Sequence, residues 1–283
     1  MKLMSYVTAT RASYGAVEGD RVFDLGIRLG GDLRSRLGPG GFADLAGALR
    51  GATADYRLDE VVFLPVIPNP GKIICVGLNY LEHRLEGNHA AKTSAPALFT
   101  RFAESQAGHL RPLVCPRESS QFDYEAEMAV VIGRAGRRIA RAEALSHIAG
   151  ISAYNDGSVR DWQLATNQWT PGKNFPATGA FGPWMVTPDE VAPDATLRLT
   201  CRLNGLEMQS ATTDMMMFDL PYLVSHVSTF TTLEPGDVIV TGTPAGVGLR
   251  RDPQVWMKHG DVVEVELEGV GVLRNPVVKE ASE

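Results

Sequence analysis

The chain contains few cysteines, and their placement excludes two classes of site. Cys75, Cys115 and Cys201 are the only cysteines among 283 residues, and no Cys-x-x-Cys spacing occurs. A thiolate zinc site or a disulfide framework needs closer or paired cysteines, so neither is expected. Because apolar residues lie within two positions of each cysteine, we predict buried, reduced thiols.

Long apolar runs and an excess of positive charge are also missing. No segment has the roughly 20 apolar residues that a transmembrane helix needs, and the formal net charge is −6. Broad nucleic-acid binding requires a dense cationic face, so neither a membrane nor a nucleic acid is an expected partner. The first ten residues hold one lysine and no apolar core of a secretory signal, which favours a cytoplasmic location.

The composition is that of a globular protein with one or two domains. Hydrophobic residues make up 44% of the chain and charged residues 21%, enough for a sizeable core. Residues 65–71 contain three prolines, and such a stretch is stiff and cannot join a sheet ladder. We therefore predict a small, cap-like N-terminal α/β domain over residues 1–68 and a main domain over residues 69–283.

Short β-like segments dominate the main domain. Alternation and β-branched content predict strands, while the few helical stretches are short. The predicted fold class is therefore α+β, mostly β. The expected strands are residues 73–77, 122–132, 148–154, 197–203, 237–241 and 262–267, and the expected helices are residues 79–86, 158–165 and 221–230.

Two glutamates stand at the head of an apolar segment. In a strand, residues two apart share a face, so Glu125 and Glu127 point the same way while the opposite face is apolar. Adjacent carboxylates repel, and a bound cation removes that cost. Oxygen ligands suit Mg²⁺ or Mn²⁺, with Ca²⁺ as a further option. The alternative is a solvated strand end without an ion.

A third carboxylate follows the next predicted buried strand. Asp156 comes where the strand over residues 148–154 gives way to a short helix, and functional groups often lie at such ends. Its alternative role is a helix N-cap. Arg160 and Gln163 are three apart and share a helix face, and together they suit a carboxylate or keto oxygens.

Six ordered blocks carry a family pattern. The chain resembles the fumarylacetoacetate hydrolase superfamily from about residue 72 to residue 278, and within it the acylpyruvate hydrolases and the 2-hydroxyhepta-2,4-diene-1,7-dioate isomerases. The resemblance implies a mixed β-sandwich roll and a homodimer. The blocks are VGLNYLEH at 76–83, DYEAE at 123–127, NDGSVRDWQ at 155–163, QWTPGKNF at 168–175, FGPW at 181–184 and TGTPAGVG at 241–248.

The resemblance also implies residue roles. Glu125, Glu127 and Asp156 match divalent-metal ligands, and the pair His83 and Glu86 matches a pair that activates water on a lid segment. The groups expected around the substrate are Arg160, Gln163, Lys173 and Thr243. Residues 176–181 depart from the commoner family sequence near the lysine, which puts the substrate choice in question more than the metal.

Some of these residues have simpler alternatives. His83 and Glu86 are one helical turn apart, so Glu86 can hold the imidazole tautomer while His83 takes a proton. A surface pair is the alternative, and Glu82 and His89 are nearby competitors. Lys173 is expected to bind an enolate oxygen or a carboxylate, with a surface lysine or Schiff-base chemistry as the alternatives.

The glycine-rich segment over residues 241–248 does not predict a nucleotide site. It lacks the Gly-Lys-Ser/Thr ending of a phosphate loop, and Pro244 interrupts any run of amide donors. A wall facing the substrate or a simple tight turn is expected.

The function expected from these residues is hydrolysis of a C–C bond in an acylpyruvate or β-diketo acid. A 1,3-dicarbonyl can chelate one cation, which stabilises the developing enolate. Decarboxylation or isomerisation of a related keto acid on the same metal site is the first alternative. A non-catalytic, metal-stabilised binding protein is the second.

Overall fold

The computed structural model describes residues 1–38 and 40–281, and strands form most of its regular structure. The largest sheet has 12 strands, ten of them in the order β4-β3-β2-β1-β14-β12-β11-β17-β6-β7, while β5 pairs with β1 and β8 with β14. The bounds are β1 Lys2–Val7, β2 Ala12–Glu18, β3 Arg21–Asp24, β4 Tyr56–Arg57, β5 Val62–Phe63, β6 Ile73–Gly77, β7 Ala97–Arg101, β8 Gln106–Ala107, β11 Ala126–Ile132, β12 Ile148–Asn155, β14 Gly179–Val186 and β17 Val238–Val240.

Two smaller sheets complete the β structure. One has five strands in the order β16-β15-β18-β19-β9, and the other pairs β10 with β13. The pairs β17–β6, β14–β8 and β19–β9 are parallel, and the other strand pairs are antiparallel. The bounds are β9 Leu113–Cys115, β10 Phe122–Asp123, β13 Ser158–Val159, β15 Arg198–Leu203, β16 Leu206–Thr212, β18 Val262–Leu267 and β19 Gly271–Lys279.

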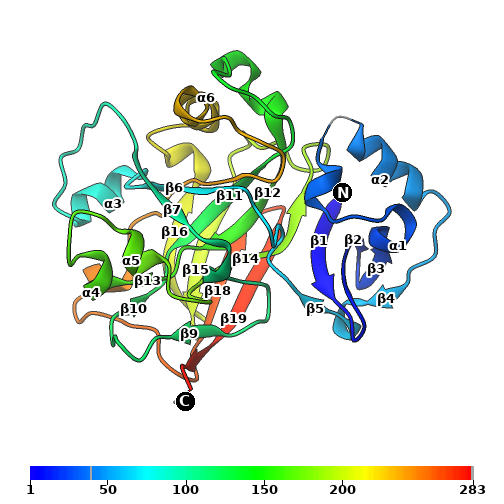
Figure 1. The fold of residues 1–283 in the computed structure, drawn as a ribbon. Helices are drawn as coiled ribbons and strands as arrows, with labels where there is room; N and C mark the ends of the chain where they lie inside the picture. The colour runs from blue at the N-terminus through cyan, green and yellow to red at the C-terminus, as the bar shows by residue number, and fades with distance from the viewer. Residues whose placement is uncertain (39, 282–283) are drawn as a thin grey trace.

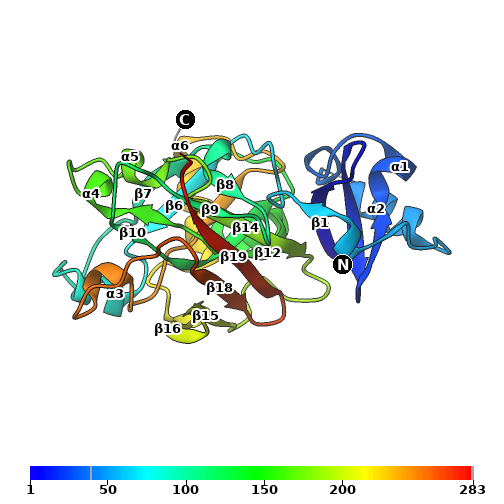
Figure 2. The ribbon, with the colours of Figure 1, turned by 90° about the horizontal axis from the view of Figure 1, so that it is seen from below.

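The α-helices of the described residues are short, with 4 to 11 residues each. The three helices α3, α4 and α5 gather at the end of the main sheet that lies away from the N-terminal part (Figures 1 and 2). None of the helices in the described residues is both long and apolar enough to span a membrane. The α-helices are α1 Leu25–Leu29, α2 Gly41–Leu49, α3 Leu81–Glu86, α4 Arg160–Gln163, α5 Thr170–Lys173 and α6 Leu220–Phe230, and the 3-10 turns are η1 Arg34–Arg36, η2 Leu58–Glu60, η3 Ala103–Ser105, η4 Arg141–His147, η5 Thr213–Met215 and η6 Gly248–Arg250.

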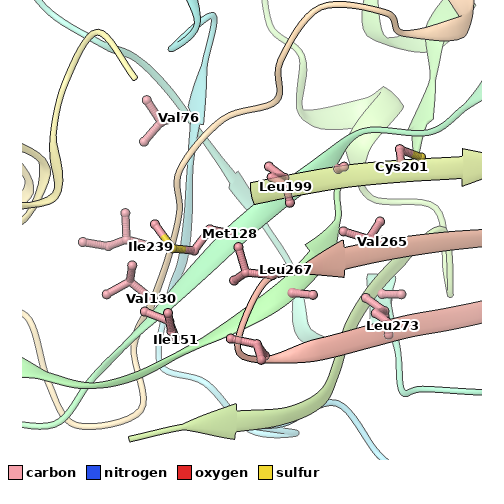
Figure 3. Packing of buried hydrophobic residues seen from close by; sticks show 14 of the residues in the cluster. Val76, Met128, Val130, Ile151, Leu199, Cys201, Ile239, Val265, Leu267 and Leu273 are labelled. Carbon is pink, nitrogen blue, oxygen red and sulfur yellow. The ribbon is translucent and has the colours of Figure 1, made fainter. Parts of the chain in front are cut away.

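The core lies on both faces of β11 and β12, whose residues are all buried. On one face, Met128 and Val130 pack in a cluster with Leu199, Val265 and Leu267 of the five-stranded sheet (Figure 3). The opposite face of β11 joins a second cluster that reaches the N-terminal part. Burying each such side chain stabilises the fold by about 1.5–3 kcal/mol. The α+β class, mostly β with mixed sheets, is therefore confirmed.

The N-terminal part continues the main sheet. Strand β1 pairs with β14 through Lys2–Val186 and Leu3–Met185, and the segment stands to one side of the molecule (Figure 1). In the proline-rich connection, Val66 and Ile67 are buried in the second cluster. The division into domains at residue 68 stays a prediction.

Two local predictions differ from the structure. The expected strand over residues 122–132 is divided into β10 and β11, with residues 124–125 between them. The expected helix over residues 158–165 begins only at Arg160, because Ser158 and Val159 pair with β10 instead. Both differences arise where the chain contributes polar side chains to one cavity.

Candidate active site

Three carboxylates converge where β11 begins and β12 ends. The antiparallel register pairs Ala126 with Asn155, and the Asp156 N–H donates to the Glu125 carbonyl at 2.9 Å. This register places Glu125 and Glu127 beside Asp156, with one oxygen of each within 4.8 Å of the others. All three residues are buried, with at most 4% of their surface exposed. The structure thus brings together the three carboxylates predicted as metal ligands.

Two of the three carboxylates already have cationic partners. Lys173 Nζ lies 2.6 Å from Glu125 Oε2 and 2.7 Å from Asp156 Oδ2. Arg160 Nη1 lies 2.7 Å from Glu125 Oε1, and Arg101 pairs with the other oxygen of Asp156. Burial alone would raise the pKa of Glu125, but the adjacent Lys173 and Arg160 cations outweigh it and hold that pKa below its usual value.

Glu127 has no cationic partner in the described part of the chain. Its Oε2 accepts the Gly242 N–H at 2.6 Å, while burial, followed by the charges of Asp156 and Glu125, raises its pKa well above the usual value. A buried carboxylate beside two others is costly unless a cation compensates it. Three converging hard oxygens fit Mg²⁺, Mn²⁺ or Ca²⁺ better than zinc.

Lys173 is a buried member of this cluster and not a surface residue. Only 1% of the surface of Lys173 is exposed, and its ammonium lies 5.0 Å from the centre of the Phe99 ring. Both hydrogen bonds to carboxylates use the charged ammonium form, which is not nucleophilic. This geometry disfavours the Schiff-base alternative and favours charge compensation.

Arg160 and Gln163 lie together on α4, as their spacing predicts. Arg160 Nη1 donates to Gln163 Oε1 at 2.8 Å and Arg160 Nε to Asp123 Oδ2 at 2.8 Å. Its Nη2 is buried without a hydrogen-bond partner among the described residues. An unpaired buried donor that lines a cavity is available to a ligand oxygen.

His83 and Glu86 form a hydrogen-bonded pair on α3. His83 Nδ1 lies 2.7 Å from Glu86 Oε1, and Glu86 Oε2 accepts the Gly246 N–H at 3.0 Å. The pair is therefore tied to the glycine-rich segment over residues 241–248. His83 lines the cavity with Glu125 and Glu127, as does its competitor His89, whereas Glu82 and Glu86 do not.

Thr243 faces the same cavity from the loop after β17. Its Oγ1 accepts a hydrogen bond from Gln209 Nε2 at 2.8 Å, and the residue is buried. The loop serves as a wall of the cavity, as expected. The lining residues are Val76, Gly77, Leu78, His83, Gly87, His89, Phe99, Glu125, Glu127, Arg160, Gln163, Leu164, Trp169, Lys173, Thr243, Val247, Leu249 and Arg250.

Sequence reasoning missed several residues that build this site. Arg101 holds Asp156, and Asp123 accepts the Gly248 and Leu249 N–H groups at 2.7 and 2.9 Å besides Arg160. Trp169 and Arg250 line the cavity. The DYEAE block contains Asp123, but no local pattern distinguishes an anchoring aspartate from a ligand, and none marks Arg101.

Comparisons with known proteins agree with this architecture. The model of the fumarylacetoacetate (FAA) hydrolase C-terminal family matches residues 72–278. The chain is 44% identical over 221 residues to oxaloacetate tautomerase FAHD2A, mitochondrial, of Bos taurus, covering 77% of this chain and 70% of that protein.

Two solved structures superpose over the whole length. Fumarylacetoacetate hydrolase from psychrophilic Exiguobacterium antarcticum has a TM-score of 0.82 and 35% identity, covering 99% of this chain and 100% of that chain. Maleylpyruvate hydrolase from Sphingobium sp. SYK-6, in complex with manganese (II) ion and pyruvate, has a TM-score of 0.83 and 26% identity with the same coverage.

Proposed function

Because the chain belongs to the fumarylacetoacetate hydrolase family, and is therefore a metal-dependent enzyme of that type, we propose that it catalyses keto–enol tautomerisation of a small 2-oxo dicarboxylic acid such as oxaloacetate. The observation that carries the proposal is the His83–Glu86 pair, whose imidazole lines the same cavity as Glu125 and Glu127 of the carboxylate cluster. The similarity to an oxaloacetate tautomerase supports this reaction.

Glu125, Glu127 and Asp156 would hold the divalent cation, with Mg²⁺ or Mn²⁺ as the ions that suit their oxygens. When bound, such an ion supplies a Lewis acid that stabilises negative charge on the substrate oxygens. The manganese and pyruvate in the maleylpyruvate hydrolase structure support the same use of this site here. The pairing of Lys173 with Glu125 and Asp156 fixes the orientation of these two carboxylates.

His83 moves the proton. Its Nδ1 faces Glu86 at 2.7 Å, which leaves Nε2 to accept a proton from the carbon next to the keto group. The electron pair of that C–H bond forms the C=C π bond, and the C=O π electrons move onto the keto oxygen. That oxygen takes the proton back from the His83 imidazolium, which gives the enol and restores the neutral imidazole. Glu86 stabilises the transient imidazolium and fixes its orientation.

The remaining groups position the substrate. Arg160 offers Nη2, which has no hydrogen-bond partner among the described residues, and Gln163 and Thr243 both line the cavity. Hydrogen bonds from these groups to the 2-oxo acid fix the C–H bond relative to His83. Such positioning lowers the entropic part of the barrier.

Hydrolysis of a C–C bond in an acylpyruvate is the second candidate. The same His83–Glu86 pair favours it, because an oriented imidazole can take a proton from water. Decarboxylation on the same site is a further alternative. The alternative of a non-catalytic binding protein is set aside because the family is one of enzymes.

The test compares reactions on the same preparation. Wild-type protein with Mg²⁺ or Mn²⁺ is expected to speed the loss of enol absorbance from freshly dissolved enol-oxaloacetate, and chelation is expected to abolish this effect. His83→Ala is expected to lower the rate about 10²–10⁴-fold. Release of pyruvate and acetate from acetylpyruvate without tautomerase activity would instead establish the hydrolase.

A further inference from the structure

The cavity is lined by both acidic and basic side chains. Glu125 and Glu127 belong to the carboxylate cluster, and Arg160 and Lys173 form ion pairs with Glu125. Arg250 and His89 also line the cavity, and neither forms an ion pair with that cluster among the described residues.

Arg250 differs from Arg160 and Lys173, the other cations of the lining, in having no side-chain partner within the described part of the chain. Arg160 pairs with Asp123 and Glu125, and Lys173 pairs with Glu125 and Asp156. Across residues 1–38 and 40–281, no carboxylate lies within 4.0 Å of the Arg250 guanidinium, and that group makes no hydrogen bond to another side chain or to the backbone. Its charge is therefore available to an anion.

The backbone fixes the place of Arg250. It ends η6, directly after the two residues whose N–H groups donate to buried Asp123 at 2.7 and 2.9 Å. Its own N–H donates to the Val247 carbonyl at 3.1 Å. Arg250 is exposed, and its guanidinium stands on an anchored turn beside the cavity, where its planar fork of donors suits a carboxylate.

Neighbouring basic groups reinforce the need for an anion. His89 lines the same cavity as Arg250. Burial, followed by the positive charges of Arg84 and Arg250, lowers the pKa of His89, so the field of these cations also favours an anion at this part of the lining.

We infer that Arg250 binds the distal carboxylate of the substrate, and that the enzyme thereby selects 2-oxo dicarboxylates over 2-oxo monocarboxylates. This inference rests on the proposed function, in which the 2-oxo acid end of the substrate occupies the region of the carboxylate cluster. A guanidinium binds a carboxylate in a bidentate manner, so a substrate lacking that group loses the contact.

Kinetics on two substrates test the inference. Arg250→Gln is expected to lower kcat/KM for oxaloacetate roughly 10- to 100-fold, mainly through KM, since a charged hydrogen bond of this kind is lost. For phenylpyruvate, a 2-oxo monocarboxylate that also enolises, kcat/KM of Arg250→Gln is expected to change less than about twofold. Arg250→Lys is expected to restore part of the selectivity.

Arg111→Gln serves as the matched control. Arg111 is exposed and does not line the cavity, so this variant removes the same charge without touching the site. Its kinetics are expected to equal those of the wild type. An equal loss for both substrates in Arg250→Gln, or no loss at all, would overturn the assignment.

A binding measurement separates this inference from the proposed reaction. Calorimetric titration of the Mn²⁺-loaded protein uses difluorooxaloacetate, which cannot enolise, and pyruvate as the monocarboxylate. Tighter binding of the dicarboxylate that disappears in Arg250→Gln supports the inference even if the wild type fails to tautomerise oxaloacetate. Equal affinity of both ligands for the wild type contradicts it even if tautomerisation occurs.

Discussion

Asp156 shows how much individual charge pairs matter in this interior. Arg101 binds one of its oxygens, and Lys173 lies 2.7 Å from the other. Arg101 also donates to the Gly157 carbonyl at 2.9 Å and to Thr178 Oγ1 at 2.9 Å. A buried carboxylate held this way keeps its orientation only while both cations stay in place.

Replacing Arg101 is therefore expected to be severe. Arg101→Met leaves Asp156 with one cation and is expected to cost about 3–5 kcal/mol of unfolding free energy, measured by urea denaturation. Arg198→Met is the control, because its ion pair with Glu207 is exposed and is expected to contribute less than about 1 kcal/mol. Similar losses in the two variants would show that the buried pair is not special.

His109 predicts a pH dependence of stability. Burial, followed by the nearby Arg274 charge, lowers its pKa from 6.5 to about 4, and its Nδ1 accepts the Arg274 N–H at 3.1 Å. The folded chain thus binds fewer protons than the unfolded chain between these values. The contribution of neutral His109 to the unfolding free energy is full above pH 6.5 and is lost as the pH falls toward about 4.

The size of this effect can be measured directly. At about 1.4 kcal/mol per pH unit, the loss amounts to at most roughly 3 kcal/mol. Urea denaturation between about pH 7 and about pH 4.5 compares wild type with His109→Asn, which keeps an acceptor but does not titrate. A shallower decline is expected in the variant, and identical pH slopes would exclude His109 as the source.

At the scale of elements, the walls of the cavity depend on close backbone packing. A Cβ on Gly77, at the end of β6, would meet the Trp169 ring at 2.2 Å. Gly77→Ala is therefore expected to displace Trp169 and to cost about 1–3 kcal/mol of unfolding free energy, together with a raised KM. Thermal denaturation and steady-state kinetics measure the two effects.

Gly47→Ala is the matched control for this substitution. Gly47 lies within α2, and its added Cβ would meet only the end of the Arg50 side chain at 3.6 Å. Because alanine forms helices more readily than glycine, the unfolding free energy of this variant is expected to rise by about 0.5–1 kcal/mol. Equal stability changes in the two glycine variants would contradict the role of Trp169 as a packed wall.

Sequence alone predicts β11 and β12 well because both strands are buried and apolar, with alternating faces. It does not predict the interruption at residues 124–125 or the strand β13. There, the backbone follows long-range contacts such as those of Asp123 with residues 248 and 249. Local alternation carries no information about partners that distant in sequence.

The same reason limits prediction of the site. Glu125 and Glu127 share a predictable face, and the family resemblance adds Asp156 and the His83–Glu86 pair. Arg101 and Arg250 belong to no such pattern, because a cation at a strand end or in a turn is usually solvated. Only the fold brings these two side chains to Asp156 and to the cavity.

At the scale of the whole molecule, the main sheet joins the N-terminal part to the rest. The β1–β14 pairing and the burial of Val66 and Ile67 in a shared cluster connect the two predicted domains. We therefore expect one cooperative thermal transition in scanning calorimetry. Two separate transitions would show that residues 1–68 fold as an independent unit. The homodimer, the keto acid partner and the cytoplasmic location remain predictions.

The central claim is that Glu125, Glu127 and Asp156 converge to hold one divalent cation. Calorimetric titration of the metal-free protein with Mn²⁺ tests it most directly, with Glu143→Gln as an exposed control remote from the cavity. We predict that wild type and control bind one Mn²⁺ ion per chain. For Glu127→Gln we predict an affinity for Mn²⁺ that is roughly 10- to 100-fold lower than that of the wild type, because one charged ligand is removed. Unchanged Mn²⁺ affinity in Glu127→Gln would contradict the account.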